Sequence, residues 1–236
     1  MRGPESVLVV AAHPDDEVLG CGGTIVRLAK EGHAVRIAIL AEGMTSRYKQ
    51  REQADPRQLE HLHTKAQQAA DKLQAKELVL CGLPDNRLDT VPLLEVVKIV
   101  EDLIERFKPQ VIYTHHPGDL NIDHGVVHRA VLTATRPTVG QFVRTIYAFE
   151  VPSSTEWAFQ TLEPAFRPNV FVDIGDTLDA KLSAMACYDT EARKFPHPRS
   201  LEALRAIAMR WGSVAGFQAA EAFELIRSLN PETGRG

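Results

Sequence analysis

The chain has 236 residues, of which 44% are hydrophobic and 25% charged, and its formal net charge is −4. This length suits one large α/β domain, and the composition is neither that of a disordered chain nor that of a membrane-spanning one. The slightly negative charge excludes the basic surface expected of a nucleic-acid-binding protein. We therefore expect one domain over residues 1–236, without nucleic acid as a partner and without stable membrane insertion.

The cysteines and the first residues predict the compartment. Cys21, Cys81 and Cys187 are odd in number and widely spaced, which favours reduced thiols over a disulfide framework. Residues 1–12 lack the charged region, longer apolar core and cleavage site of a signal peptide. Together these features predict a cytoplasmic protein.

The most informative stretch is residues 7–24, VLVVAAHPDDEVLGCGGT. Residues 7–12 are apolar, rich in β-branched residues and do not alternate with polar ones, which predicts a central parallel strand buried on both faces. Directly after it come His13, Asp15 and Asp16. Because ligands bind beyond the carboxyl ends of strands in open α/β sheets, these side chains indicate a metal site.

The remaining pattern alternates strands and helices. A helix is expected from Asp16 or Glu17 to Glu31, and a strand over residues 34–40 completes a βαβ unit, which implies a parallel sheet. Further helices are predicted over residues 55–75, 91–107, 122–135, 176–188 and 201–210, and further strands over 77–81, 110–113, 145–149 and 170–173. Residues 219–229 fit either a helix or a strand. The fold class predicted is α/β, Rossmann-like, with a mainly parallel sheet and helices on both faces.

The glycines of residues 20–25 invite a dinucleotide-binding interpretation, but the pattern fails. Ile25 occupies the third glycine position, and the glycines lie inside the predicted helix rather than in the turn after the strand. We expect them instead to allow close packing of the helix, or close approach of backbone to the metal site.

A second strand runs into histidines and acids over residues 114–124, THHPGDLNIDH. A helix capped at Asn121 or Asp123 would place His124 in its first turn. The two stretches end at the same edge of one parallel sheet, so they can converge on a metal ion. Catalytic zinc takes three protein ligands and keeps a position for water. His13, Asp16 and His124 would supply such a set, and Asp15 is placed to take a proton from that water.

At these residues the chain resembles the LmbE-like, PIG-L-like zinc deacetylases, which remove acetyl groups from N-acetylglucosamine units and related amides. The resemblance rests on residues 12–17, AHPDDE, with the glycines that follow, and on Asp123-His124. Carried over by position, it implies zinc on His13, Asp16 and His124, and Asp15 as general base and then acid. Another divalent ion could occupy the same ligands.

The chain departs from the family pattern at one position. Family members often carry a histidine three residues before the second metal histidine, where it is thought to stabilise the oxyanion, and here that residue is Asn121. Either the Asn121 amide takes this role or a histidine from elsewhere does, namely His115, His116 or His197. Asp123 is expected to orient His124 or its loop.

Polar loops at the carboxyl edge supply candidate substrate-binding residues. These are Arg47 after the second strand, Asp85 after the third, Asn121 after the fourth, and His197 in the basic, proline-containing segment 191–200. The last segment suits an anionic substrate group or a neighbouring subunit of a homo-oligomer.

The sequence therefore predicts a zinc-dependent N-deacetylase acting on an acetamido sugar or its conjugate. Three alternatives remain open. An amidase for a thiol conjugate or another non-sugar amide would keep the same catalytic residues and differ in its loops. A nucleotide-binding Rossmann enzyme is disfavoured by the defective glycine pattern. A non-catalytic carbohydrate-binding relative would not need a free carboxylate beside a metal site. The sequence does not distinguish which sugar, aglycone or pathway is involved.

Overall fold

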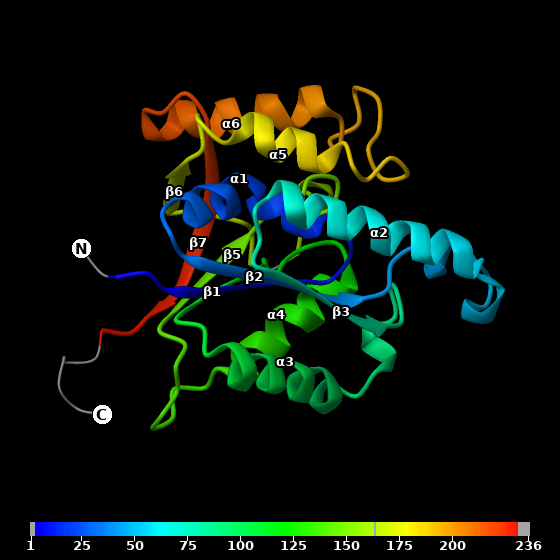
Figure 1. Ribbon diagram of the computed structural model, residues 1–236. Coiled ribbons are helices and arrows are strands. Elements are labelled where there is room, and N and C mark those ends of the chain that lie inside the picture. The colour runs from blue at the N-terminus through cyan, green and yellow to red at the C-terminus, as the bar shows by residue number, and fades with distance from the viewer. Residues whose placement is uncertain (1–2, 163, 231–236) are drawn as a thin grey trace.

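The computed structural model describes residues 3–162 and 164–230 and contains a seven-stranded sheet in this part of the chain (Figure 1). The strand order is β3, β2, β1, β4, β5, β7, β6. The first five strands pair in parallel, and β7 pairs antiparallel with both β5 and β6. The strands are β1 (Ser6–Ala11), β2 (Ala34–Ala41), β3 (Glu77–Leu83), β4 (Val111–His115), β5 (Thr145–Phe149), β6 (Val170–Asp173) and β7 (Ala220–Ser228).

Six α-helices in the described part of the chain cover both faces of this sheet (Figure 1). On one face lie α1 (Asp16–Lys30), α2 (Pro56–Lys72), α5 (Leu178–Met185) and α6 (Leu201–Ala215), and on the other lie α3 (Leu93–Phe107) and α4 (Ile122–Ala134). The predicted α/β class, a mainly parallel sheet with helices on both faces, is confirmed. In residues 3–162 and 164–230, none of the helices is long and apolar enough to cross a membrane.

Strand β1 lies at the centre of the hydrophobic core. Its residues alternate between two apolar clusters: Val7, Val9 and Ala11 belong to the cluster under α1 and α2, whereas Leu8 and Val10 belong to the cluster under α3 and α4. Burial on both sides explains why the strand is apolar without alternation. It also fixes the position of His13, two residues beyond the strand end.

The C-terminal segment forms β7, which resolves the choice left open by its sequence. Alanine and glutamate favour a helix, but residues 220–223 are buried and the strand has hydrogen-bonding neighbours on both sides. Phe223 joins the core cluster that contains Val9. Tertiary pairing and burial therefore override local helix propensity here.

The glycines of α1 serve close packing, as expected. A Cβ added at Gly20 would lie 2.3 Å from the ring of Phe149, at the end of β5, and one at Gly23 would lie 2.8 Å from Ile174. The helix also kinks at Cys21, whose φ of −146° is not helical. Packing therefore requires glycine at positions 20 and 23.

The sheet order places a topological switch between β1 and β4. From β1 the chain continues outward through β2 and β3, and it then returns to add β4 on the other side of β1. Adjacent strands whose connections leave in opposite directions open a crevice at their carboxyl ends. The histidine-containing segments after β1 and β4 meet at this crevice.

Candidate active site

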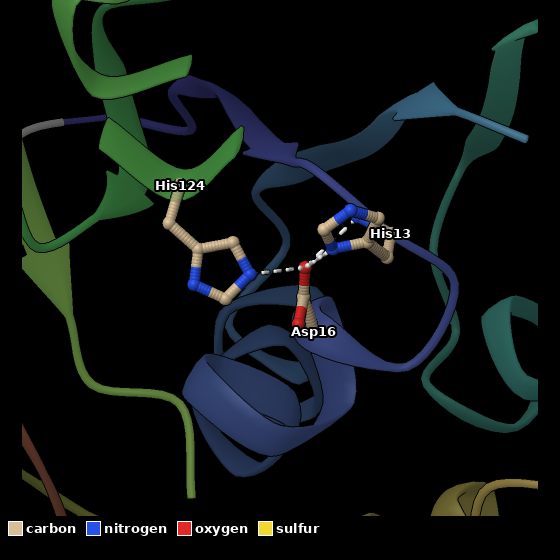
Figure 2. A group of neighbouring side chains, drawn as sticks. All are labelled: His13, Asp16 and His124. Carbon is tan, nitrogen blue, oxygen red and sulfur yellow. Dashed lines mark hydrogen bonds and ion pairs between the residues drawn. The ribbon is translucent and has the colours of Figure 1, made fainter. Parts of the chain in front are cut away.

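His13, Asp16 and His124 converge at the switch point (Figure 2). His13 follows β1, Asp16 is the first residue of α1, and His124 lies in the first turn of α4. His13 Nδ1 and His124 Nε2 each lie 3.2 Å from Asp16 Oδ2. One ligand atom from each of the three residues lies within 4.8 Å of the other two. The convergence predicted from two distant sequence stretches is therefore present.

The environment of this group fits a divalent cation. His124 and Asp16 are each only 1% exposed. The Nε2 of His124, which faces Asp16, is buried and, within residues 3–162 and 164–230, has no aligned hydrogen-bond partner. Buried polar atoms rarely remain unsatisfied, and two imidazoles with one carboxylate form a ligand set typical of catalytic zinc. The donor set and its burial therefore suit a metal ion that leaves one coordination position open.

Two further carboxylates contact the outward nitrogens of the metal-site histidines. Asp119 Oδ1 lies 3.0 Å from His124 Nδ1, and Asp123 Oδ2 lies 3.0 Å from His13 Nε2. We expected Asp123 to orient His124 or its loop, and in the structure its Oδ2 contacts His13 instead of His124. The reason is the helical geometry of α4, which points the adjacent side chains 123 and 124 in different directions. Each histidine is thus oriented by a carboxylate on its far side.

These orienting carboxylates are themselves held by loops. Asp119 accepts hydrogen bonds from the hydroxyls of Ser154 and Thr155, the latter at 2.6 Å. Asp123 Oδ1 accepts the backbone N–H of Leu88 at 2.9 Å. The histidine positions therefore depend on the segment after β5 and on the β3–α3 connection, which no spacing rule in the sequence indicates.

Asp15 lies beside the metal group in a strained backbone conformation. It is 1% exposed and has a φ of 104°, in the left-handed region that non-glycine residues rarely adopt. Such strain costs roughly 1–3 kcal/mol and persists only where surrounding contacts impose it. Here Glu17 Oε2 accepts the Asp15 N–H at 3.1 Å, and Arg199 Nη1 donates to Asp15 Oδ2 at 2.7 Å.

The electrostatics of Asp15 and Asp16 differ although the residues are adjacent. Burial raises the pKa of Asp15 well above its ordinary range, against the opposing effect of Arg199. Burial also favours protonation of Asp16, but His124 and His115 reverse this effect and hold the Asp16 pKa well below its ordinary range. Asp16 is thus suited to bind a metal as an anion, whereas Asp15 has the higher proton affinity. A general acid–base catalyst needs such a raised proton affinity.

A cavity of about 130 Å³ opens beside these residues. Among the predicted substrate-binding residues, Arg47, Asp85 and Asn121 line it, whereas His197 does not. Its lining is otherwise mostly polar and comprises His13, Pro14, Asp15, Asp16, Gly43, Met44, Ser46, Leu62, Asn86, Glu191 and Arg199.

The predicted substrate-binding residues already have protein partners. Arg47 pairs with Glu191, and Asp85 accepts the backbone N–H of Ser46 at 2.9 Å. Asn121 caps α4 by accepting the N–H of Asp123, and its amide donates to Asn86 at 2.8 Å. A ligand entering the cavity would meet a pre-formed polar network rather than free side chains.

The alternative oxyanion histidines are placed away from this cavity. His115 is fully buried and its Nε2 accepts the backbone N–H of Ala12 at 2.8 Å. His116 lies between Glu224 and the carbonyl of Pro164, and His197 Nδ1 accepts the N–H of Arg199. Of the candidates considered for this role, Asn121 lines the cavity.

Sequence reasoning missed Arg199, Glu191 and Asp119 as parts of the site. Arg199 and Glu191 belong to the segment 191–200 noted for its basic character. Arg199 contacts Asp15 across 184 positions of sequence, and Glu191 pairs with Arg199 and Arg47. Asp119 lies within the histidine-containing stretch 114–124, so its position was a usable signal. A side chain four or more residues before a metal histidine in a loop has no fixed geometry, which is why its role required the structure.

The fold and site define a class: an α/β protein with a buried His-Asp-His group and an adjacent carboxylate at the switch point of its sheet. A family model described as PIG-L, GlcNAc-PI de-N-acetylase, matches residues 8–135. The match includes Asp15 and the three residues of the candidate metal centre. The chain belongs to the PIG-L family, and it is accordingly an enzyme of a deacetylase family that hydrolyses amides.

Individual relatives agree with this family. The chain is 29% identical over 187 residues to YaiS, an uncharacterized deacetylase of Escherichia coli, covering 77% of this chain and 89% of that protein. It is 27% identical over 210 residues to a probable N-acetyl-alpha-D-glucosaminyl L-malate deacetylase 2 of Bacillus cereus, covering 87% and 93%. The fold matches that of N,N'-diacetylchitobiose deacetylase from Pyrococcus horikoshii with a TM-score of 0.76, at 21% identity, covering 98% and 88%.

Proposed function

We propose that the protein is a zinc-dependent N-deacetylase that hydrolyses the acetamide of an N-acetylglucosamine-type sugar or its conjugate. The observation that carries this proposal is the position of Asp15, a buried carboxylate beside the His-Asp-His group and on the wall of the same cavity. A site for binding alone needs no such carboxylate. The names of the relatives, which specify N-acetylglucosaminyl and diacetylchitobiose substrates, support the choice of sugar class.

In the proposed mechanism His13, Asp16 and His124 hold the metal ion. When bound, zinc would polarise the amide carbonyl and lower the pKa of a coordinated water. Asp15 takes the proton from the attacking water and then gives it to the departing sugar amine, so one carboxylate serves both half-reactions. Asp119 and Asp123 keep the two imidazoles in the tautomers that leave a lone pair facing the ion.

Asn121 is the proposed side-chain donor to the developing oxyanion. Its Nδ2 makes one hydrogen bond, to Asn86, so a second amide N–H remains for the substrate. It also occupies the position three residues before His124, where the family resemblance leads one to expect a histidine. Loss of one oxyanion donor costs roughly a hundredfold to a thousandfold in rate, so this residue is expected to affect kcat strongly.

Arg47 and Asp85 are the proposed contacts to the sugar hydroxyls. They line the cavity from two neighbouring loops, one after β2 and one after β3, and carry complementary donors and acceptors. The His197 side chain does not contact the cavity in this structure, because its ring packs edge-on against the ring of Trp157. A role for His197 would require movement of the 191–200 segment.

Two companion proposals rest on sequence. The odd number and wide spacing of Cys21, Cys81 and Cys187 support the proposal that the protein is cytoplasmic. The 191–200 segment is offered as the contact to a neighbouring subunit if the protein forms a homo-oligomer. Both remain predictions, to be measured by localisation and by sedimentation.

A substrate panel tests the proposed function. Zinc-loaded protein is incubated with N-acetylated sugars, sugar lipids, nucleotide sugars, thiol conjugates and other non-sugar amides, and free amine and acetate are quantified. Equal release of both products from a sugar class supports the proposal and identifies the substrate. Release from the thiol conjugates or other non-sugar amides alone would favour the alternative amidase, which shares the catalytic residues. No release from zinc-loaded protein across the panel would contradict both.

A further inference from the structure

Residues 188–199, which connect α5 to α6, reach back over the N-terminus of α1 and contact Asp15 and its neighbour Glu17 at two points. We propose that Arg199 is a positioning residue that fixes the carboxylate of Asp15 for proton transfer, with Tyr188 fixing the backbone of the same residue through Glu17. The inference rests on the proposed function, because it concerns the acid–base group of that reaction.

The side chain of Asp15 is fixed by a guanidinium that is itself held at a second point. Arg199 Nη1 donates to Asp15 Oδ2 at 2.7 Å, and Arg199 Nε donates to Ser153 Oγ at 2.7 Å. The arginine side chain is 23% exposed and the aspartate 2%. A planar guanidinium bonded at two edges has little rotational freedom, so it defines the plane and direction of the carboxylate.

One oxygen of Asp15 is left for the reaction. Among the described residues, the Asp15 carboxylate accepts one hydrogen bond, from Arg199 at Oδ2, and Oδ1 accepts none. A carboxylate anchored through a single oxygen presents the other in a set direction. Oδ1 is therefore the atom that would take the proton from water and return it to the amine, while Arg199 stays bonded to Oδ2 throughout.

The backbone of Asp15 is fixed by the other end of the same segment. The Tyr188 hydroxyl donates to Glu17 Oε1 at 2.6 Å, and Glu17 Oε2 accepts the N–H of Asp15. Tyr188 and Glu17 are both buried, and the φ of Asp15 is 104°. Because an isolated aspartate would leave this conformation, the two contacts from the segment stabilise a placement that the local sequence does not favour.

Kinetics of three variants separate positioning from substrate binding. Arg199→Gln removes the charge, Arg199→Lys keeps it without the fork, and Arg136→Gln is a control at an exposed arginine beyond the far end of α4. We expect Arg199→Gln to lower kcat about a hundredfold with KM within about twofold and with unchanged zinc content, because a misplaced group loses rate rather than affinity. Arg199→Lys should recover part of kcat, and Arg136→Gln should match the wild type.

Chemical rescue provides a readout that a general loss of structure would not give. Added guanidinium should restore turnover of Arg199→Ala by about tenfold or more, since the ion can occupy the vacated space beside Asp15, and it should not restore Asp15→Asn. An unchanged kcat in Arg199→Gln overturns the inference. So does a rise in KM alone, which would make Arg199 a substrate-binding residue.

A double-mutant cycle tests the contact between Arg199 and Asp15 without measuring activity. It can therefore contradict the positioning role of Arg199 even if the protein is a deacetylase, and support it even if the protein is not. Unfolding free energies are measured in urea for the wild type, Asp15→Asn, Arg199→Gln and the double variant. Residues in direct contact are expected to couple, which corresponds to a threefold or greater departure from additivity in the unfolding constant. Additive effects would show that Arg199 does not hold Asp15, whatever the substrate panel gives.

Discussion

Asp119 is the residue that most clearly extends the site beyond its predicted ligands. It contacts His124 Nδ1 at 3.0 Å while two hydroxyls hold its carboxylate in place. Burial alone would raise the pKa of Asp119, but its contacts with His124 and these hydroxyls lower it to about 2. The carboxylate is therefore anionic across the working pH range and acts as a fixed orienting group.

Replacing Asp119 with Asn should weaken metal binding. The variant keeps the size of the side chain but removes the charge that orients His124, and loss of such a partner typically costs 10-fold to 100-fold in metal affinity. Zinc affinity is measured by competition with a chelator. Asp179→Asn, at an exposed aspartate paired with Arg205, is the control. An affinity within twofold of the wild type would contradict the orienting role.

At this scale the sequence indicated the metal group, Asp15 and the cavity residues Arg47, Asp85 and Asn121, but not Arg199 or Asp119. His13, Asp16 and His124 follow strand ends or lie in a first helical turn, where a strand–loop–helix pattern fixes their direction. Arg199 and Asp119 lie in irregular loops. Their positions depend on where those loops pack, which local patterns do not encode.

Helix α1 shows what individual elements require. It starts at the metal site and carries two glycines that contact other elements at distances too short for a Cβ. Gly20 faces Phe149 and Gly23 faces Ile174. Gly20 and Gly23 lower the intrinsic helix propensity of α1, but they allow its N-terminus to lie close to the carboxyl ends of β4 and β5.

A matched pair of glycine variants tests this packing. Gly20→Ala should destabilise the protein by about 1–3 kcal/mol, because the added methyl would overlap the Phe149 ring. Gly125→Ala, in α4, meets no atom closer than 3.8 Å and should be neutral or stabilising by up to about 1 kcal/mol. Urea unfolding measures both. Equal effects at the two positions would contradict the assignment of close packing to Gly20.

Element by element, hydrophobic periodicity predicted the strands and helices well up to residue 215. The exception is residues 219–229, where helix propensity and β-pairing were in conflict. Strand β7 forms because β5 and β6 both offer unpaired edges at that position and because residues 220–223 are buried. Such pairing connects residues 47 to 83 positions apart, from Asp173–Ala220 to Thr145–Ser228, beyond the reach of any local window.

On the scale of the whole molecule, a buried ion pair joins α1, α5 and β7. Lys181 Nζ donates to Glu221 Oε1 at 2.5 Å and to the carbonyl of Leu19 at 2.9 Å. Glu221 also accepts the backbone N–H groups of Gly23 and Thr24. These contacts satisfy the backbone near the kink of α1 and tie the C-terminal strand to the helix that begins at the site.

Removing one partner of this pair should destabilise the fold strongly. Lys181→Met leaves the Glu221 carboxylate buried without its cation, which typically costs about 3–5 kcal/mol. Lys181→Met combined with Glu221→Gln should recover part of that loss, because the unpaired charge is gone. Urea unfolding of the two variants is the measurement. A Lys181→Met protein as stable as the wild type would rule out a structural role for the pair.

The metal-free protein should show a characteristic dependence of stability on pH. Burial opposes protonation of both histidines, but hydrogen bonds to Asp123 and Asp16 raise the pKa of His13 to about 10, and Asp16 and Asp119 raise that of His124 to about 9. A folded-state pKa above the unfolded value of about 6.5 stabilises the protein below pH 6.5. That stabilisation should decline as the pH rises through 9 and 10.

Thermal unfolding of EDTA-treated and zinc-loaded protein between pH 6.5 and 10 tests this dependence. The metal-free Tm should fall over the range, and zinc should flatten the decline because metal-bound histidines are neutral. His124→Asn should reduce the slope in the metal-free protein. A metal-free Tm that rises with pH over this interval would contradict the assigned electrostatics.

The central claim is that Asp15 carries protons for a reaction at the His-Asp-His group. The most direct measurement compares acetate release from an N-acetylated sugar by wild-type protein and Asp15→Asn, with zinc content determined for both. The account predicts one zinc per chain in each protein and a loss of roughly 10²-fold to 10⁴-fold in kcat for the variant. Turnover of Asp15→Asn at the wild-type rate, with equal zinc content, would contradict it.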